Sequence, residues 1–415
     1  MLNVRRFIVK LFRFKGILKV VAFSFSNRNR RLDLTVKPYK NGCRCPECGR
    51  RGKIVRQRTE VRYWKDLPVH GIEVNLCYAP KEILCPTHGR VQEDIPWAEN
   101  HARISYRFEY ALLRFCQAMT QKMAAELLRI PKSTLSDLLH AIITRERADH
   151  KIRNLREVGV DEVSYRKGHK YATIVYDLKK SKVVWIGAGK EKETLVRFMK
   201  KLTPYQRDKI QFACCDMAEG YIVVIKEWLK KATLVIDRFH IVKKLNESMD
   251  EVRKEEWRKV PKKQKKIFKG VRWLLFRHSS NRRKRDTRTI NRLKRSNNRI
   301  YRAWLLKDEF EHFWEYAYVG AAESFLKKWS TRALKSRLEP MREFVATLRK
   351  YQEHILPFIE TGLTNARAEG INRIIGIIKN RASGFETLKA LSDIIFLTVG
   401  DLDIPGQILA RFHTI

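Results

Sequence analysis

The chain has 415 residues, enough for about two to four domains that each bury a core of their own. Its 87 Lys and Arg residues outnumber its 45 Asp and Glu residues, which gives a formal charge of +42. This excess favours a nucleic acid as partner, with an anionic membrane surface as the weaker alternative. A membrane-spanning protein is not expected, because no apolar run approaches the roughly 18–20 residues that a span requires.

The N-terminus and the cysteines both favour an intracellular protein. The first residues mix basic and apolar side chains as a signal peptide does, but Lys10, Arg13, Lys15 and Lys19 interrupt the apolar stretch. Eight cysteines in a chain of this length do not suggest a disulfide framework. We therefore expect reduced thiols and a cytoplasmic location.

Residues 1–100 predict a small β-rich module that binds zinc. Residues 58–64 and 72–76 alternate apolar and polar side chains with the period of a strand. Two pairs of metal-ligating residues with two-residue spacing flank these strands, so that a metal would join the two ends of a small sheet. The predicted ligands of this tetrahedral structural site are Cys45, Cys48, Cys85 and His88.

Alternatives to this zinc site remain open on the sequence. The cysteines could be incidental turn residues, although two such pairs, each with Pro at its second position, favour a metal site. Cys43 lies two residues before Cys45 and could replace it as the first ligand. Cys77 falls within a predicted strand and is expected in the core.

Residues 101–150 predict a helix-turn-helix domain. A short helix at 123–128 is followed by a turn at 129–131, and a second helix runs over 135–143 with an apolar stripe. Pro131 and the hydroxyls of Ser133 and Thr134 favour an immediate helix restart, with the hydroxyls as the N-cap. The second helix would then enter the major groove, and Lys132, Ser133 and Thr134 would contact DNA. An ordinary helical hairpin used for packing is the alternative.

Residues 151–240 predict a mixed α/β sheet. Three strands come in succession and are followed by alternating helices and strands, which is the order of an RNase H-like fold. The predicted strands are 157–163, 171–177, 182–187, 210–215 and 233–237, and the predicted helices are 192–202 and 219–231.

The rest of the chain reads as helical. Residues 241–360 are very basic and contain five interleaved tryptophans, and the run at 282–285 predicts phosphate contacts by Arg282, Arg283, Lys284 and Arg285. Residues 361–415 contain two helices joined around Ser383 and Gly384, and we expect them to complete the core of the sheet domain. The fold class is therefore a multidomain α/β protein whose core is interrupted by an all-α insertion.

Three carboxylates are candidates for catalysis. Asp161 follows the apolar run 158–160 in the first predicted strand, and Asp216 directly follows the predicted strand 210–215. Glu369 lies on a helix that places Asn365, Asn372, Arg373 and Gly376 on its face and Ile371, Ile374, Ile375 and Ile378 opposite. Carboxylates gathered at one sheet edge can bind two divalent ions for phosphodiester chemistry. Each residue alone could equally be a turn acid or a solvated helix residue. Asp237 is a rival for the second metal ligand, and His240 could be a capped core histidine.

Four blocks of the sequence resemble bacterial insertion-sequence transposases of the ISL-three family. The blocks are Asp161–Thr173 (DEVSYRKGHKYAT), Cys215–Tyr221 (CDMAEGY), Asp237–His240 (DRFH) and Asn365–Arg373 (NARAEGINR). The metal-ligand pairs and the helix-turn-helix match as well, so the resemblance covers essentially the whole chain. The N-terminal stretch 1–35 has no clear counterpart, and His88 stands where another Cys would also be natural.

The resemblance implies a DDE transposase with an RNase H-like core and a helical insertion. Carried over by position, Asp161, Asp216 and Glu369 would bind two Mg²⁺ or Mn²⁺ ions, and Asp237 and His240 would support them. The implied partners are the terminal inverted repeats of the element and target DNA, with a homo-oligomer assembled on DNA and the protein associated with the bacterial nucleoid. A DNA-binding regulator without catalysis and an RNase H-like nuclease are the alternatives.

Overall fold

The structure is a computed structural model that describes residues 8–10, 12, 14, 16–39, 43–57, 59–148, 150–166, 168, 170–261, 265, 271–362 and 366–413. The chain divides into two compact units. One consists of Met1–Lys151 together with Ile375–Ile415, and the other of Ile152–Ile374. Among the described residues, no helix combines the length and the apolar character that a bilayer crossing needs.

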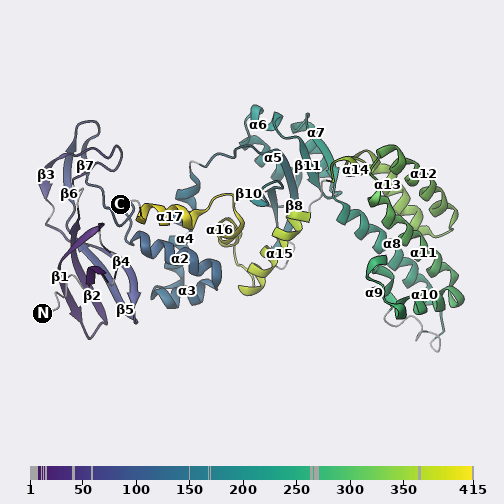
Figure 1. Ribbon diagram of the computed structural model, residues 1–415, viewed down its shortest axis with the longest axis horizontal. Helices are drawn as coiled ribbons and strands as arrows, with labels where there is room; N and C mark the ends of the chain where they lie inside the picture. The colour runs from purple at the N-terminus through teal and green to yellow at the C-terminus, as the bar shows by residue number, and fades with distance from the viewer. Residues whose placement is uncertain are drawn as a thin grey trace. The chain divides into compact units, whose positions relative to one another are not determined.

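The first unit begins with a four-stranded sheet in the order β1-β2-β5-β4 (Figure 1). The β2–β5 pair is parallel and the other two pairs are antiparallel. One face buries an apolar cluster in which the Trp64 ring meets the Trp97 ring edge-on at 5.7 Å. The strands are β1 (Leu18–Ser26), β2 (Arg31–Pro38), β4 (Arg62–Val69) and β5 (Ile72–Tyr78).

A separate three-stranded antiparallel sheet has the order β3-β6-β7. Its strands are β3 (Lys53–Gln57), β6 (Lys81–Cys85) and β7 (Gly89–Gln92). The two predicted strands between the metal-ligand pairs, 58–64 and 72–76, therefore fall in the four-stranded sheet. The expectation that the metal joins the ends of the sheet formed by those strands was wrong, because the chain leaves the small sheet after β3 and returns to it at β6.

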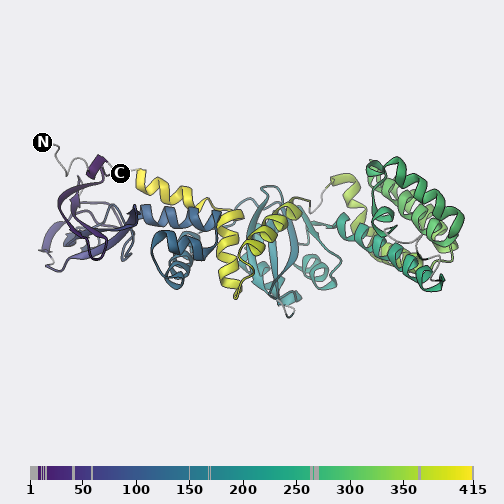
Figure 2. The same ribbon diagram turned by 90° about the horizontal axis from the view of Figure 1, so that it is seen from below.

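Helices from both ends of the chain complete the first unit. The helix α17 packs along α2, and α16 packs on α4 (Figure 2). Ion pairs reinforce these contacts, with His140 Nδ1 at 3.0 Å from Asp393 and Arg147 at 2.7 Å from Asp401. The helices are α2 (Tyr106–Ala118), α3 (Gln121–Leu128), α4 (Lys132–Ala148), α16 (Leu388–Val399) and α17 (Ile404–His413).

The second unit is built on a five-stranded sheet in the order β10-β9-β8-β11-β12. The first three strands are antiparallel, whereas β11 is parallel to both β8 and β12. All five predicted strands are confirmed within a few residues, as β8 (Glu157–Arg166), β9 (Lys170–Asp177), β10 (Lys182–Ala188), β11 (Phe212–Cys215) and β12 (Thr233–Ile236). The helices between them are α5 (Lys192–Lys201), α6 (Pro204–Asp208) and α7 (Glu219–Trp228).

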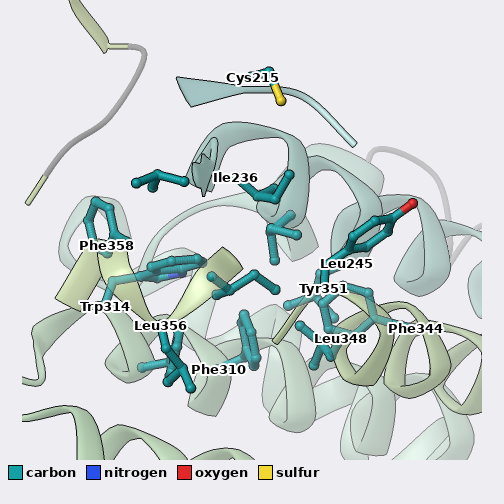
Figure 3. Packing of buried hydrophobic residues seen from close by; sticks show 14 of the residues in the cluster. Cys215, Ile236, Leu245, Phe310, Trp314, Phe344, Leu348, Tyr351, Leu356 and Phe358 are labelled. Carbon is teal, nitrogen blue, oxygen red and sulfur yellow. The ribbon is translucent and has the colours of Figure 1, made fainter. Parts of the chain in front are cut away.

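The basic segment that follows is helical in its described part and shares one hydrophobic core with this sheet. Figure 3 shows Cys215 and Ile236 of the sheet in the same cluster as Leu245, Phe310 and Phe344 of the helices. The helices are α8 (Arg238–Lys259), α9 (Val271–Phe276), α10 (Lys284–Ser296), α11 (Asn298–Phe310), α12 (Val319–Lys335), α13 (Glu339–Ile355) and α14 (Pro357–Thr361).

The C-terminal segment is divided between the two units. Helix α15 (Ala366–Arg381) begins in the second unit, but the residues from Ile375 onward belong to the first. The two predicted helices and their joint are confirmed, since Ser383 and Gly384 both have positive φ. However, α16 does not extend the core of the sheet unit, because it buries its apolar face on α2 and α4.

Candidate active site, metal centre and nucleic-acid interface

The four predicted zinc ligands form one cluster. Cys45 and Cys48 lie in the turn before β3, Cys85 ends β6, and His88 lies in the turn into β7. The Sγ atom of Cys45 is 3.5 Å from His88 Nδ1, and Cys48 Sγ is 3.5 Å from Cys85 Sγ. All four donor atoms lie within 4.8 Å of one another. A tetrahedral zinc site requires ligand atoms about 3.5–3.8 Å apart, so the donor set fits this ion.

The surroundings of the cluster also suit a bound cation. Backbone N–H groups of His88 and Thr87 lower the pKa of the Cys85 thiol to about 6. With Nδ1 of His88 facing the sulfurs, its Nε2 lies 3.4 Å from a carboxylate oxygen of Glu47, an arrangement that orients ligating histidines. Cys43 is outside the cluster, with its backbone N–H donating to Glu93.

The predicted helix-turn-helix is formed by α3 and α4. The turn contains Arg129 in a left-handed conformation, and Ala124 and Ala125 are buried. Helix α4 starts three residues earlier than predicted, at Lys132. The prediction that Ser133 and Thr134 cap it was wrong, because Pro131 precedes the helix and both hydroxyl residues lie in its first turn. Lys132, Ser133 and Thr134 are all exposed, which leaves them accessible to DNA.

Asp161 lies midway along β8, the central strand of the five-stranded sheet, two residues beyond the last β8 residue that pairs with β11. One oxygen accepts from the backbone N–H of Glu162 at 2.7 Å, and the other accepts from the side-chain amide of Asn372 at 2.6 Å. Burial raises the pKa of Asp161, and the negative charge of Asp216 raises it further, whereas the charge of His240 lowers it. Asp216 and His240 therefore both lie within electrostatic range of Asp161.

Asp216 and Asp237 follow the neighbouring parallel strands β11 and β12. Asp216 is partly exposed and accepts from the backbone N–H of Ala218 at 3.0 Å. The carboxylate of Asp237 is buried and caps α8 through the backbone N–H of Phe239 at 3.2 Å. Its other oxygen lies 4.0 Å from Nε2 of His240. Asp216 thus has the more exposed carboxylate, whereas the carboxylate of Asp237 caps the start of α8.

Helix α15 carries Glu369 and is hydrogen-bonded to Asp161 of β8 through Asn372. Glu369 is exposed and has no hydrogen bond or ion pair to a described residue. Asn372 is three residues further on, hence on the same helix face, and it donates to Asp161 while accepting from Tyr176 Oη. Ile371, Ile375 and Ile378 are buried, as predicted for the apolar face of this helix. Ile374 was predicted on the same face, but it is 39% exposed, so that prediction was wrong.

Two residues beside the carboxylates were not assigned a role from the sequence. Asn372 was predicted only as a polar neighbour of Glu369, although its three-residue spacing from Glu369 is a usable signal. Glu162 was not singled out, because alternation places it on the opposite face of β8 from Asp161. Burial raises the pKa of Glu162, and the negative charge of Asp216 raises it further. The Tyr221 hydroxyl contacts Glu162 and also Thr173, at 2.9 Å.

The predicted phosphate-binding run does not present all of its side chains to solvent. Arg282 is directed inward, where it forms an ion pair with Asp308 and its guanidinium lies 4.9 Å from the centre of the Trp304 ring. Its side chain is only 14% exposed, and burial lowers its pKa. Arg283, Lys284 and Arg285 are exposed at the start of α10. This placement argues against a phosphate contact by Arg282, since this arginine holds the α9–α10 loop to α11.

Known proteins resemble the chain over most of its length. Residues 158–395 match the ISL3 family of DDE proteins described as transposase, and residues 93–143 match the helix-turn-helix domain of transposase family ISL3. The transposase for insertion sequence element IS1557 of Mycobacterium tuberculosis is 27% identical over 394 residues, which cover 88% of each chain. The transposase for insertion sequence element IS1001 of Bordetella parapertussis is 28% identical over 360 residues, which cover 86% of this chain and 88% of that protein.

The family match alone extends over more than half of the chain and includes the strands and the helix that carry the three carboxylates. The second match coincides with the helices α2, α3 and α4. The predicted resemblance is thus confirmed, and the chain belongs to the ISL3 (ISL-three) family of insertion-sequence transposases.

Proposed function

We propose that this transposase binds the terminal inverted repeats of its own element and catalyses metal-dependent DNA strand cleavage and strand transfer. The observation that carries the proposal is the meeting of carboxylates at one sheet edge. Asp161 and Asp216 interact electrostatically there, and the helix that bears Glu369 is tied to Asp161 by the amide of Asn372. The family supports DNA as the substrate.

We infer that the five-stranded sheet is the core of an RNase H-like fold. Three antiparallel strands followed by two parallel ones, with the carboxylates on the central strand and its parallel neighbour, support this assignment. In this arrangement the helical region is an insertion between β12 and α15. The shared hydrophobic core supports a rigid attachment of that insertion to the sheet.

Asp161, Asp216 and Glu369 would hold two Mg²⁺ or Mn²⁺ ions. Carboxylate oxygens are the ligands that these hard cations prefer, and the mutual repulsion of Asp161 and Asp216 favours a bound cation. Such ions supply activation of the attacking oxygen and stabilisation of the leaving oxygen. Asn372 orients the carboxylate of Asp161, and Asp237 fixes the start of the helix on which His240 lies.

We assign DNA recognition to the first unit and to α10. The exposed Lys132, Ser133 and Thr134 begin the second helix of the helix-turn-helix, whose N-terminal residues reach base edges in this motif. The cluster of Cys45, Cys48, Cys85 and His88 would bind a structural Zn²⁺ ion, since four protein ligands leave no open position for catalysis.

Labelled duplex carrying the ends of the element tests this function. The full-length protein is incubated with it and with an unlabelled target DNA, with and without Mg²⁺. We expect Mg²⁺-dependent cleavage at the element end and joining of the labelled strand to the target. Cleavage without joining would instead indicate a nuclease, and binding without cleavage would indicate a regulator.

The exposed start of α10 should bind phosphates without reading sequence. Replacing Arg283, Lys284 and Arg285 by Gln should weaken cognate and random duplex alike. If all three neutralise phosphates, the slope of log affinity against log salt should fall by about 2.7, at roughly 0.9 per phosphate. Fluorescence anisotropy over a salt series measures this slope. A change in which sequence is preferred would make this segment a specificity element.

Arg282→Gln is the contrasting variant within the same run. Because Arg282 is paired with Asp308 inside the helical region, its loss should lower the free energy of unfolding by about 1–3 kcal/mol. The salt slope of DNA binding should remain unchanged. Chemical denaturation and anisotropy of the same preparation separate the two effects. A salt slope reduced as for Arg283→Gln would show that Arg282 reaches phosphate after all.

Asn372 should act by orienting Asp161. Asn372→Leu keeps the size of the side chain but removes the donor, so cleavage should fall by about 10–100-fold and require more Mg²⁺. DNA binding should be retained. The readout is the cleavage rate over an Mg²⁺ titration. Asn380→Leu is the matched control, with an exposed asparagine on the same helix, and should cleave normally. An unchanged Mg²⁺ dependence for Asn372→Leu would contradict the positioning role.

A further inference from the structure

A cavity of about 440 Å³ lies along helix α8 in the second unit. Its walls include Phe239, Val242 and Asn246 from α8, and Arg272 and Phe276 from α9. This volume falls within the range of small-molecule sites, which are mostly apolar with a few placed polar groups. None of the roles proposed above uses this cavity.

The walls of the cavity suit a flat, apolar-faced group. Phe239 is 51% exposed although it is a large aromatic residue, so its ring is available for stacking. The guanidinium of Arg272 lies 5.5 Å from the centre of the Phe276 ring and adds a second planar surface. Asn246 contributes a polar residue to the same wall.

The charged side chains that line the cavity have no net charge in total. The side chains that line it include three cationic and three acidic residues, namely Lys243, Lys254 and Arg272 against Glu247, Asp250 and Glu251. Two of the acids are already paired, because Lys254 lies 3.1 Å from Glu251 and Arg272 lies 3.5 Å from Asp250. A neutral lining selects neither a free phosphate nor a divalent cation. It fits a neutral, planar group.

The Phe239 end of the cavity lies at the start of α8. Phe239 lies between Asp237 and His240 in the sequence, and its ring meets the His240 ring edge-on at 5.4 Å. The charge of His240 in turn acts on Asp161. A group held against Phe239 is therefore close to the DNA strand on which the carboxylates would act.

We propose that this cavity accepts one unpaired nucleobase of the DNA near the cleavage position. The base stacks on Phe239, while its backbone remains outside. The inference rests on the proposed function, because it assumes that DNA lies at the carboxylates. Stacking on an aromatic side chain is tolerant of base identity, so any base can occupy the site.

Three DNA duplexes test the proposal, with the full-length protein and without Mg²⁺ so that no strand is cut. One has blunt ends, one carries a single unpaired 2-aminopurine nucleotide, and one carries a single abasic nucleotide in its place. We expect the base-bearing duplex to bind about ten-fold more tightly than the abasic one, with a change in 2-aminopurine fluorescence. Equal affinity for the two would overturn the proposal. Failure to bind any duplex would instead count against the DNA-binding function itself.

Matched variants test whether residues of the cavity cause the preference for the base-bearing duplex. Phe239→Leu keeps an apolar side chain but removes the ring, and should abolish the preference for the base while leaving blunt-duplex affinity unchanged. Tyr318→Leu removes a 79% exposed aromatic residue outside the cavity and should preserve this preference. If Phe239→Leu and Tyr318→Leu weaken all three duplexes equally, the aromatic residues provide general DNA contacts and the proposed base site is wrong. Thermal unfolding of each variant checks the fold.

Discussion

Replacing Asp161, Asp216 or Glu369 by Ala should abolish strand cleavage while DNA binding persists. Each change removes an oxygen ligand for the ions that would activate the attacking oxygen. Binding should survive, because the helix-turn-helix and the exposed start of α10 lie outside the carboxylate cluster. Removing a negative charge from a basic protein can only strengthen its binding to DNA, which is a polyanion. Gel assays of binding and Mg²⁺-dependent nicking on the same DNA measure both properties.

The control for this prediction is Asp237→Ala. The buried Asp237 carboxylate caps α8, so its loss should reduce activity and stability without necessarily ending cleavage. Asp216 has the more exposed carboxylate and acts electrostatically on Asp161, which favours it as the second metal ligand. Full nicking by the Asp216→Ala variant with none by the Asp237→Ala variant would reverse this assignment.

The sheet could be predicted from the sequence because its strands carry strong local signals. Buried strands such as β11 and β12 are short apolar runs that end at an acid, and β8 and β9 are rich in β-branched and aromatic residues. The position of Asp216 follows directly, because it comes immediately after β11, whereas Asp161 lies within β8 and not at its end. Glu369 could be placed on a helix, but the link of this helix to Asp161, which the amide of Asn372 provides, has no signal in the sequence.

Features that depend on tertiary packing could not be predicted. Arg282 stands in a run of four basic residues, and nothing local distinguishes it from its neighbours. Its inward direction is set by Asp308 and Trp304, more than twenty residues away in the sequence. Likewise, the attachment of α16 and α17 to the first unit depends on partners such as Asp393 with His140, which are far apart in the chain. Local periodicity carries no information about such pairings.

The ligands of the metal cluster are evident from the sequence, but the division of the neighbouring strands between two sheets is not. The spacing within each ligand pair predicted all four residues of the cluster. This spacing could not reveal that the strands between the ligand pairs belong to a second sheet. Strand alternation does not specify the sheet to which a strand belongs. This separation matters for stability, since the four-stranded sheet has a hydrophobic cluster of its own.

Loss of zinc should therefore unfold the three-stranded sheet alone. All five residues of β3 are exposed, so this sheet has little apolar surface to hold it without an ion. Structural zinc contributes about 10–16 kcal/mol of apparent binding free energy in small zinc modules. Cys48→Ser or Cys85→Ser should lose the metal, expose residues 43–57 and 81–92 to proteolysis and weaken binding to the element ends. The sheet of the second unit should remain folded.

Cys43→Ser is the matched control, because Cys43 lies two residues before Cys45 but outside the cluster. We expect this variant to keep about one zinc ion per chain by elemental analysis, as the unmodified protein should. Zinc loss from Cys43→Ser as complete as from Cys48→Ser would make Cys43 a ligand in place of Cys45. An unmodified protein purified without chelators that contains no zinc, yet resists proteolysis over the same residues, would contradict a structural zinc site altogether.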